Sequence, residues 1–416
     1  MRSNSFKFNC GGRRAEVRPR VVITGIGLVT ALGQELDVFW DRLLSGASGI
    51  TPVESFDSSR YRVHCGAEVK GFHPEPGTWR CDVGDVGRAF QFAISAAAAA
   101  LRDGVDTRKL LGHRWSLFIG TTSGEPQEIE RYDDSKMAAD ENGRPLLSRY
   151  PCHLLAANVA EEFGFTGGVS VVPAACAAGN HALARAVDSL RSGRADWVLA
   201  GGADCFSRIT FSGFARLAAI AKERCQPFDL NRQGMIPGEG SAMLLLERME
   251  KARSRRARIY AEVAGYGLSC DAHHMTGAHP LGLGAVRAME NALADARVDR
   301  RDISYISAHG TGTRSNDHVE SLAVKTVFTR EGAPPMSSIK SMLGHAMGAA
   351  SAIEAAVCAL ALKSDKIPPT INYCDPDPEC DLDYVPNTCR ELPVRVAMNN
   401  AYAFGGTNSS LLLRKC

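Results

Sequence analysis

Two patterns of apolar and polar positions alternate along the chain. Short runs rich in valine, isoleucine and leucine end near glycines, which is typical of buried strands. Longer segments between them, several rich in alanine, predict helices. The predicted strands lie at 20–27, 115–119, 168–173, 197–200, 243–246, 260–266, 303–307 and 336–339, with two more near Val396 and Leu411. The predicted helices lie at about 34–45, 90–101, 176–192, 285–296 and 348–362. Strands that alternate with helices predict α/β layers.

The strand–helix pattern starts again near residue 282, and this predicts two related halves. A strand–loop–helix unit surrounds Cys176, and a similar unit surrounds His345. We place the first half, with the cysteine, at 20–270 and the second half, with the histidines, at 271–416.

Three segments depart from the regular pattern. The glycines that end the first apolar run, 20–27, predict that the strand turns sharply there. Residues 125–149 are polar, charged and weakly periodic, so we expect a surface excursion. Residues 1–19 are basic and lack an apolar core segment, which predicts a disordered tail and argues against a secretory signal.

Composition and charge exclude several classes of protein. The chain has 416 residues, of which 45% are hydrophobic and 23% charged, as in a soluble globular protein too long for one simple core. The net charge of +2 indicates neither nucleic acid nor a membrane surface as partner, and we see no run of the roughly 20 apolar residues that a membrane span needs. The 13 cysteines form no C-x-x-C pair, which disfavours structural zinc and suggests reduced thiols in the cytoplasm.

Cys176 is the first candidate for chemistry. It follows a predicted strand in the run 171–180 (VVPAACAAGN) and has small neighbours that leave room for a substrate. Free backbone N–H groups and the dipole at a helix start stabilise a thiolate, so we expect a lowered pKa for this thiol. Taken alone, the motif is more often that of a buried structural cysteine.

His309 lies on a glycine-rich loop after another predicted strand. The run 307–313 (SAHGTGT) places Thr311 and Thr313 next to it. A single histidine at a strand end is more often structural, but the hydroxyl–glycine–hydroxyl spacing suggests a loop that binds an elongated polar ligand.

Two further loops carry the same kind of signal. His345 follows a glycine turn in 337–348 (SSIKSMLGHAMG), with Lys340 five residues upstream. The run 399–408 (NNAYAFGGTN) has a Gly-Gly turn after Phe404, where backbone N–H groups can point into a cleft as an oxyanion hole requires.

Together, these four motifs resemble the beta-ketoacyl-[acyl-carrier-protein] synthases of type II fatty acid and polyketide synthesis. The resemblance runs from about residue 20 to 413 and includes the words PFD, GEG, DAHHMT and IPPT at 227–229, 238–240, 271–276 and 367–370. It implies a thiolase-like α/β fold, layered α-β-α-β-α and built from two related halves. It also implies an acyltransferase that extends acyl chains by decarboxylative Claisen condensation with malonyl-[acyl-carrier protein].

The resemblance assigns a role to each candidate residue. Cys176 matches the nucleophile that takes the acyl group. His309 and His345 match the two histidines that stabilise the enolate formed from malonyl. The backbone N–H groups of Cys176 and Phe404 match the oxyanion hole.

Other matches concern support and substrate binding. Lys340 and Glu320 match a charged pair behind the histidines. Thr311 and Thr313 match hydroxyls that bind the pantetheine arm, and Phe404 matches an aromatic gate of the acyl pocket. We predict no cofactor. We also claim no metal, because Ser307 stands where some members have an asparagine of a monovalent cation site, although Glu354 matches another part of that site.

The resemblance also implies partners and leaves alternatives open. The expected partners are acyl carrier protein and a second subunit, in a homodimer or in a heterodimer with a chain-length factor. A thiolase would use a second cysteine, and the histidine pair argues against it. A chain-length factor itself normally lacks the nucleophile. A non-catalytic scaffold would not need all four loops intact.

Overall fold

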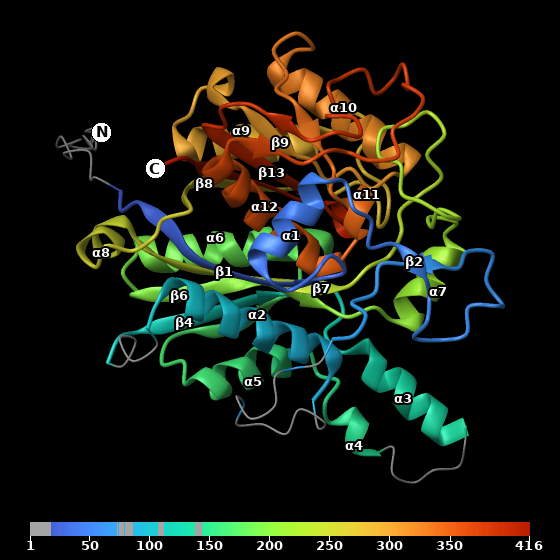
Figure 1. The fold of residues 1–416 in the computed structure, drawn as a ribbon, viewed down its shortest axis with the longest axis horizontal. Helices are drawn as coiled ribbons and strands as arrows, with labels where there is room; N and C mark the ends of the chain where they lie inside the picture. Colours follow the sequence, from blue (N-terminus) through green and yellow to red (C-terminus); the bar gives the residue numbers. More distant parts are fainter. Residues whose placement is uncertain (1–17, 73, 75–78, 80–85, 107–111, 138–143) are drawn as a thin grey trace, which may run out of the picture.

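The structure is a computed structural model that describes residues 18–72, 74, 79, 86–106, 112–137 and 144–416 (Figure 1). The tail predicted at 1–19 falls outside these residues except for its last two positions.

One large mixed sheet organises the molecule. Among the described residues it has ten strands, in the order β10-β9-β13-β14-β8-β1-β7-β6-β4-β5. The strands are β1 (Val21–Thr30), β4 (Trp115–Gly120), β5 (Val169–Val172), β6 (Trp197–Asp204), β7 (Gly240–Arg248), β8 (Ala261–Cys270), β9 (Tyr305–Ser307), β10 (Met336–Ser337), β13 (Val396–Tyr402) and β14 (Thr407–Arg414). Two small sheets pair β2 (Thr51–Pro52) with β3 (Cys65–Gly66) and β11 (Lys366–Ile367) with β12 (Arg390–Glu391).

The large sheet consists of two halves with the same pairing pattern. From β1 through β7, β6 and β4 to β5, two antiparallel pairings are followed by two parallel ones. The series β8, β14, β13, β9, β10 repeats this pattern. The halves join where Val21–Ile23 of β1 pair with 261–263 of β8. The predicted two related halves are therefore confirmed. The boundary at residue 270 stays a prediction, and it falls at the end of β8, the first strand of the second series.

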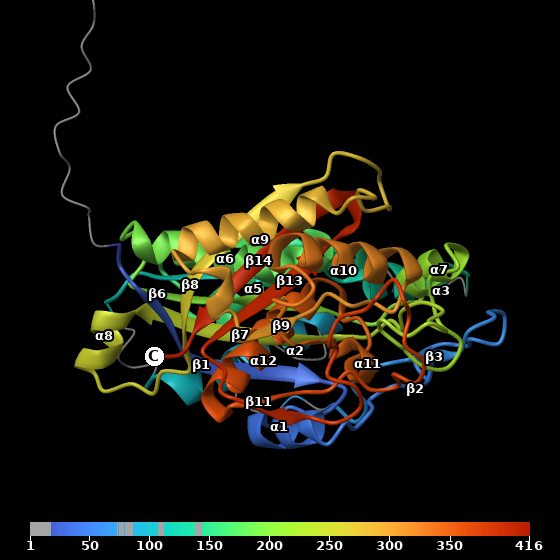
Figure 2. The same ribbon diagram turned by 90° about the horizontal axis from the view of Figure 1, so that it is seen from above.

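Helices complete the layers on both sides of each half-sheet (Figures 1 and 2). The central layer holds α6 and α12, the first half-sheet is covered by α2 and α5, and the second by α9 and α10. The helices are α1 (Leu36–Leu44), α2 (Arg88–Gly104), α3 (Pro126–Met137), α4 (Arg144–Leu147), α5 (His153–Phe163), α6 (Ala178–Arg191), α7 (Arg208–Arg216), α8 (Met249–Ser254), α9 (Leu283–Ala296), α10 (Arg314–Phe328), α11 (Lys340–Leu343) and α12 (Ala350–Ser364). This is the predicted α-β-α-β-α layering.

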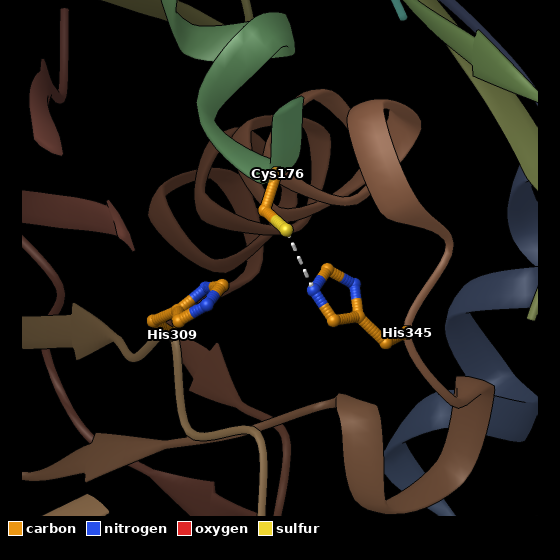
Figure 3. A group of neighbouring side chains, drawn as sticks. All are labelled: Cys176, His309 and His345. Carbon is orange, nitrogen blue, oxygen red and sulfur yellow. Dashed lines mark hydrogen bonds between the residues drawn. The ribbon is translucent and has the colours of Figure 1, made fainter. Parts of the chain in front are cut away.

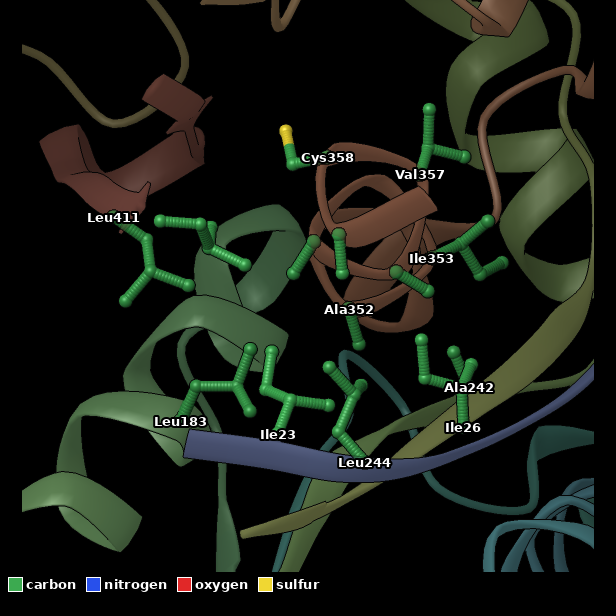
Figure 4. Packing of buried hydrophobic residues seen from close by; sticks show 14 of the residues in the cluster. Ile23, Ile26, Leu183, Ala242, Leu244, Ala352, Ile353, Val357, Cys358 and Leu411 are labelled. Carbon is green, nitrogen blue, oxygen red and sulfur yellow. The ribbon is translucent and has the colours of Figure 1, made fainter. Parts of the chain in front are cut away.

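The central helix α12 is buried on all sides. In Figure 4, Ile23, Leu244 and Leu411 from the two half-sheets and Leu183 from α6 lie against two sides of it. The stretch Met347–Ser364 has the length and composition of a membrane span, which we did not expect from the sequence, but 89% of it is buried. Its apolar character is explained by its place in the central layer.

The glycines of the first strand do not make the predicted sharp turn, and they serve helix packing instead. β1 continues through Gly25 and Gly27 to Thr30. A β-carbon at Gly27 would lie 2.0 Å from the carbonyl oxygen of Ala96, so these glycines let α2 pack directly on the strand. The second half has the same close packing of a helix on a strand, because a β-carbon at Gly267 of β8 would lie 2.0 Å from the carbonyl oxygen of Ala288 in α9.

Two other expectations are corrected. The strand predicted as buried at 168–173 is β5, the last strand of its half-sheet, and Val169 is 37% exposed because nothing in the described chain covers that edge. The described parts of 125–149 form an exposed arm with α3 and α4 (Figure 1), but this segment begins in the core. The buried Glu125 carboxylate accepts hydrogen bonds from the backbone N–H groups of Ala89 and Phe90 at the start of α2.

Replacement of Gly27 by alanine tests the close approach of β1 and α2. We expect Gly27→Ala to lower the free energy of unfolding by about 1–3 kcal/mol, because a backbone carbonyl cannot move away as a side chain can. The matched control is Gly213→Ala in α7, where a β-carbon meets no atom within 4 Å. It should raise stability by about 0.5–1 kcal/mol. Urea denaturation measures both, and equal midpoints for the two variants would contradict the packing described above.

Candidate active site

Three chemically active side chains meet at the edge of the central layer (Figure 3). Cys176 lies in the short turn η4 (Ala175–Ala177) that leads into α6, His309 follows β9, and His345 follows α11. Ala175 has a φ of 45°, in the region that L-residues rarely adopt, so the chain bends sharply just before the cysteine. One donor atom from each of the three side chains lies within 4.8 Å of the others.

The closest contact joins the cysteine to one histidine. His345 Nε2 lies 3.1 Å from Cys176 Sγ, and the His309 ring stands edge-on to the His345 ring with centroids 5.5 Å apart. A base in contact with the sulfur can take its proton when the sulfur attacks a substrate.

Burial sets the protonation states of these groups. It raises the pKa of the Cys176 thiol to about 12, although the positive charge of Lys340 acts in the opposite direction. Burial, and then Lys340, hold the pKa of both His309 and His345 well below 6.5. At neutral pH the site therefore contains a thiol and two uncharged imidazoles. The lowered cysteine pKa predicted from the helix start is wrong, because burial outweighs the local effect of the helix.

Lys340 has a different partner from the predicted one. Its buried ammonium forms an ion pair with Glu354 of α12. Both side chains are only 1% exposed, so each charge depends on the other for its stability.

Glu320 positions the His309 loop instead. Its buried carboxylate accepts hydrogen bonds from the backbone N–H groups of His309 (2.8 Å) and Gly310 (2.7 Å). Burial raises the pKa of Glu320 to about 7, and these hydrogen bonds oppose that shift. Glu320 thus holds the His309 loop through backbone groups, and its predicted supporting role stays a prediction.

One pocket of about 110 Å³ brings the remaining predicted residues together with the cysteine. Thr311 and Thr313 line it, with their hydroxyl oxygens 2.9 Å apart. Phe404 lines it too, is 43% exposed, and packs against Phe214 with ring centroids 5.7 Å apart. Gly405 follows with a φ of 83°, which only glycine adopts readily. This geometry is compatible with the predicted gate and oxyanion hole, whose roles stay predictions.

Sequence reasoning missed two residues of this region. Asp204, at the end of β6, accepts hydrogen bonds from the backbone N–H groups of Thr122, Ser123 and Gly348, and so ties together two loops beside the site. Tyr402, the last residue of β13, lines the pocket. The motif around Phe404 includes Tyr402, but nothing in the sequence pattern marks which of its side chains face the pocket.

The same three side chains are the only cluster of metal-ligating groups in the part of the chain that the structure describes. One sulfur and two imidazole nitrogens suit a soft ion such as Zn²⁺. A bound ion would occupy the sulfur and the imidazole nitrogens that nucleophilic chemistry requires, so we retain the prediction of no metal.

Comparisons with known proteins find similarity along nearly the whole chain. The family model "Beta-ketoacyl synthase, N-terminal domain" matches residues 18–252, and "Beta-ketoacyl synthase, C-terminal domain" matches residues 260–374. The chain is 36% identical over 412 residues to the 3-oxoacyl-[acyl-carrier-protein] synthase 2 of Synechocystis sp., with 96% of this chain and 98% of that protein covered.

Solved structures resemble it along nearly the whole chain. "The ishigamide ketosynthase/chain length factor" superposes with a TM-score of 0.92 at 41% identity, covering 96% of this chain and 100% of that chain. A type II PKS acyl carrier protein in complex with its ketosynthase, AntDE:AntF, gives a TM-score of 0.87 at 32% identity, with the same coverage. The predicted thiolase-like fold is confirmed.

The pH dependence of Cys176 alkylation tests the protonation state of the thiol. Because burial raises its pKa to about 12, the thiolate fraction should rise about tenfold per pH unit from pH 7 to pH 10 without a plateau. Peptide mass spectrometry after iodoacetamide treatment measures this rate at one residue. The urea-denatured chain, in which the same thiol should level off near pH 9, is the control. A plateau below pH 9 in the folded protein would show a stabilised thiolate instead.

Removal of one member of the buried ion pair tests how much an unpaired charge at this place destabilises the folded protein. Lys340→Met leaves the Glu354 carboxylate uncompensated, so we expect a loss of about 3–5 kcal/mol in the free energy of unfolding. The double variant Lys340→Met/Glu354→Leu should recover most of this loss. Its pH–rate profile should have an acid limb moved to higher pH, because Lys340 no longer lowers the pKa of the two histidines. An unchanged stability of Lys340→Met would exclude a charged pair.

Proposed function

This chain belongs to the beta-ketoacyl synthase family, and from that premise we propose that it condenses an acyl group held on Cys176 with a malonyl unit presented by an acyl carrier protein. The observation that carries the proposal is the convergence of Cys176, His309 and His345 within 4.8 Å beside one pocket. The reaction forms a carbon–carbon bond, as fatty acid or type II polyketide synthesis requires. No cofactor is needed, because the substrates are activated as thioesters.

The first half of the proposed reaction loads the enzyme. Cys176 Sγ attacks the thioester carbon of the incoming acyl group while its proton moves to Nε2 of His345, 3.1 Å away. The negative oxygen of the tetrahedral intermediate is stabilised by the backbone N–H groups of Cys176 and Phe404. The intermediate then expels the carrier thiolate, which takes the proton back from His345, and leaves an acyl-cysteine and an uncharged imidazole.

The second half extends the chain. The bond between the malonyl carboxylate and the α-carbon breaks, its electron pair enters the thioester as an enolate, and carbon dioxide leaves. Each uncharged imidazole has one N–H to donate, so His309, and His345 in the tautomer protonated on Nε2, can hold the enolate oxygen. The enolate carbon attacks the acyl-cysteine, and Cys176 leaves as a thiolate, which takes a proton from water to restore the resting thiol. Thr311 and Thr313 bind the pantetheine arm in this scheme.

The partners follow from the same scheme and from the open edge of the sheet. We propose acyl carrier protein as the substrate-bearing partner and a cytoplasmic location. A second subunit would cover β5, whose Val169 is exposed at the edge of the sheet. That subunit is a second copy of the chain or a chain-length factor. The resemblance to a solved ketosynthase/chain length factor supports the heterodimer as a second candidate.

Intact mass spectrometry tests the loading step. The wild-type protein, incubated with carrier proteins that bear acyl chains of graded length, should gain the mass of one acyl group, and Cys176→Ala should gain none. Both proteins should be tested alone and with a candidate chain-length factor, with native mass spectrometry reporting the subunits present. Acylation of Cys176→Ala would show that another residue is the nucleophile. If the wild-type protein gains no mass under any of these conditions, the non-catalytic scaffold becomes the better explanation.

A further inference from the structure

Tyr402 presents a buried hydroxyl group without a partner. The side chain is 8% exposed, and among the described residues no atom forms a hydrogen bond with its oxygen. Its ring stands at 70° to the His309 ring, with centroids 5.8 Å apart, and it lines the same pocket as Cys176 and His345. Tyr402, which carries the unsatisfied hydroxyl, is therefore part of the wall of the site where the substrates must meet.

Other buried tyrosines of the chain do not share this property. The Tyr305 hydroxyl lies 2.9 Å from Ser337 Oγ, and the Tyr384 hydroxyl lies 2.8 Å from Ser321 Oγ. Both side chains are at most 1% exposed. A buried hydroxyl without a hydrogen bond destabilises the folded protein, and a phenylalanine would avoid that cost. The exception at Tyr402 points to a partner that arrives with a ligand.

The hydroxyl can act only as an uncharged donor or acceptor. Burial, followed by the negative charges of Glu320 and Asp271, raises the pKa of Tyr402 well above 10, so it keeps its proton at physiological pH. No lysine or arginine is found among the described residues that line the pocket. An anionic group that enters beside His309 must therefore be held by neutral donors.

The proposed function supplies such an anion, and the inference rests on it. The malonyl unit must place its thioester oxygen at the two histidines, which brings its carboxylate into the same small pocket. Decarboxylation removes the negative charge from this carboxylate, so a strong cationic partner would stabilise the starting state and slow the reaction. A single neutral hydroxyl can orient the carboxylate at a lower cost in rate.

We propose that the Tyr402 hydroxyl donates a hydrogen bond to the malonyl carboxylate and orients it for loss of carbon dioxide. The carbon–carbon bond breaks, its electron pair enters the enolate at His309 and His345, and the hydroxyl keeps its proton throughout. Tyr402 then contacts the extender unit, whereas loading of Cys176 does not use it.

Tyr402→Phe separates the two half-reactions. Octanoyl-carrier protein reports loading through the intact mass of the acyl-enzyme, and malonyl-carrier protein reports decarboxylation through its conversion to acetyl-carrier protein. We expect kcat/KM for decarboxylation to fall about 10–100-fold, with a higher KM for malonyl-carrier protein, and the loading rate to stay within about twofold of wild type. The melting temperature should not fall, because the variant loses a hydroxyl that has no partner in the free protein.

Tyr384→Phe is the matched control. It removes a buried hydroxyl that does have a partner, Ser321, and that lies outside the pocket lining. It should lower the melting temperature and leave both half-reactions unchanged.

Two results would overturn the assignment of Tyr402. Unchanged decarboxylation by Tyr402→Phe would show that the hydroxyl does not contact the extender, and equal slowing of loading and decarboxylation would show a general packing role. Failure of the wild-type protein in both half-reactions would overturn the proposed function itself, which is a distinct outcome.

Discussion

The backbones of the two central helices touch, and the active site depends on this contact. A β-carbon on Gly179 of α6 would lie 2.5 Å from the backbone nitrogen of Ala352 in α12, so only glycine allows the approach. The Ser351 hydroxyl also accepts a hydrogen bond from the backbone N–H of Asn180. Both contacts lie within one turn of the helix starts, so the two preceding loops are brought side by side. The 3.1 Å contact between Cys176 and His345 is a direct consequence of this packing.

The same depth of burial determines the electrostatics of the site. It makes a thiolate costly and keeps both histidines uncharged, so the resting site carries no net charge at the reacting atoms. The positive charge of Lys340 is paired with Glu354 yet still acts on the histidines and the cysteine. Such a site stabilises negative charge only through neutral donors. In a low-dielectric pocket these donors gain most of their effect when charge develops on the substrate during the reaction.

The sequence was informative wherever neighbouring residues in the chain determine the local structure. The four loops could be found because each has glycines and a reactive side chain next to an apolar run, and all but Lys340 of the predicted catalytic and substrate-binding residues line one pocket. It was less informative where the structure depends on contacts between segments that lie far apart in the sequence. The glycines of β1 read as a turn because α2, which they accommodate, lies about 70 residues later. The partner of Lys340 was misassigned because the sequence does not show which acidic residue meets its ammonium, and only the fold brings Glu354 rather than Glu320 to it. The cysteine pKa was misjudged because burial cannot be read from the helix start.

The internal symmetry of the fold explains why only one half carries the nucleophile. η4 precedes α6 as η6 (Met347–Ala349) precedes α12, and Ala175 and Met347 share the same left-handed bend. Gly348 therefore occupies the place in the second half that Cys176 occupies in the first. A β-carbon at Gly348 would lie 2.6 Å from the backbone of Thr121, so no side chain fits there. The second half instead contributes its histidines from the loops before that turn and after β9, and the chemistry becomes asymmetric because packing leaves room for a reactive side chain at only one of two equivalent helix starts.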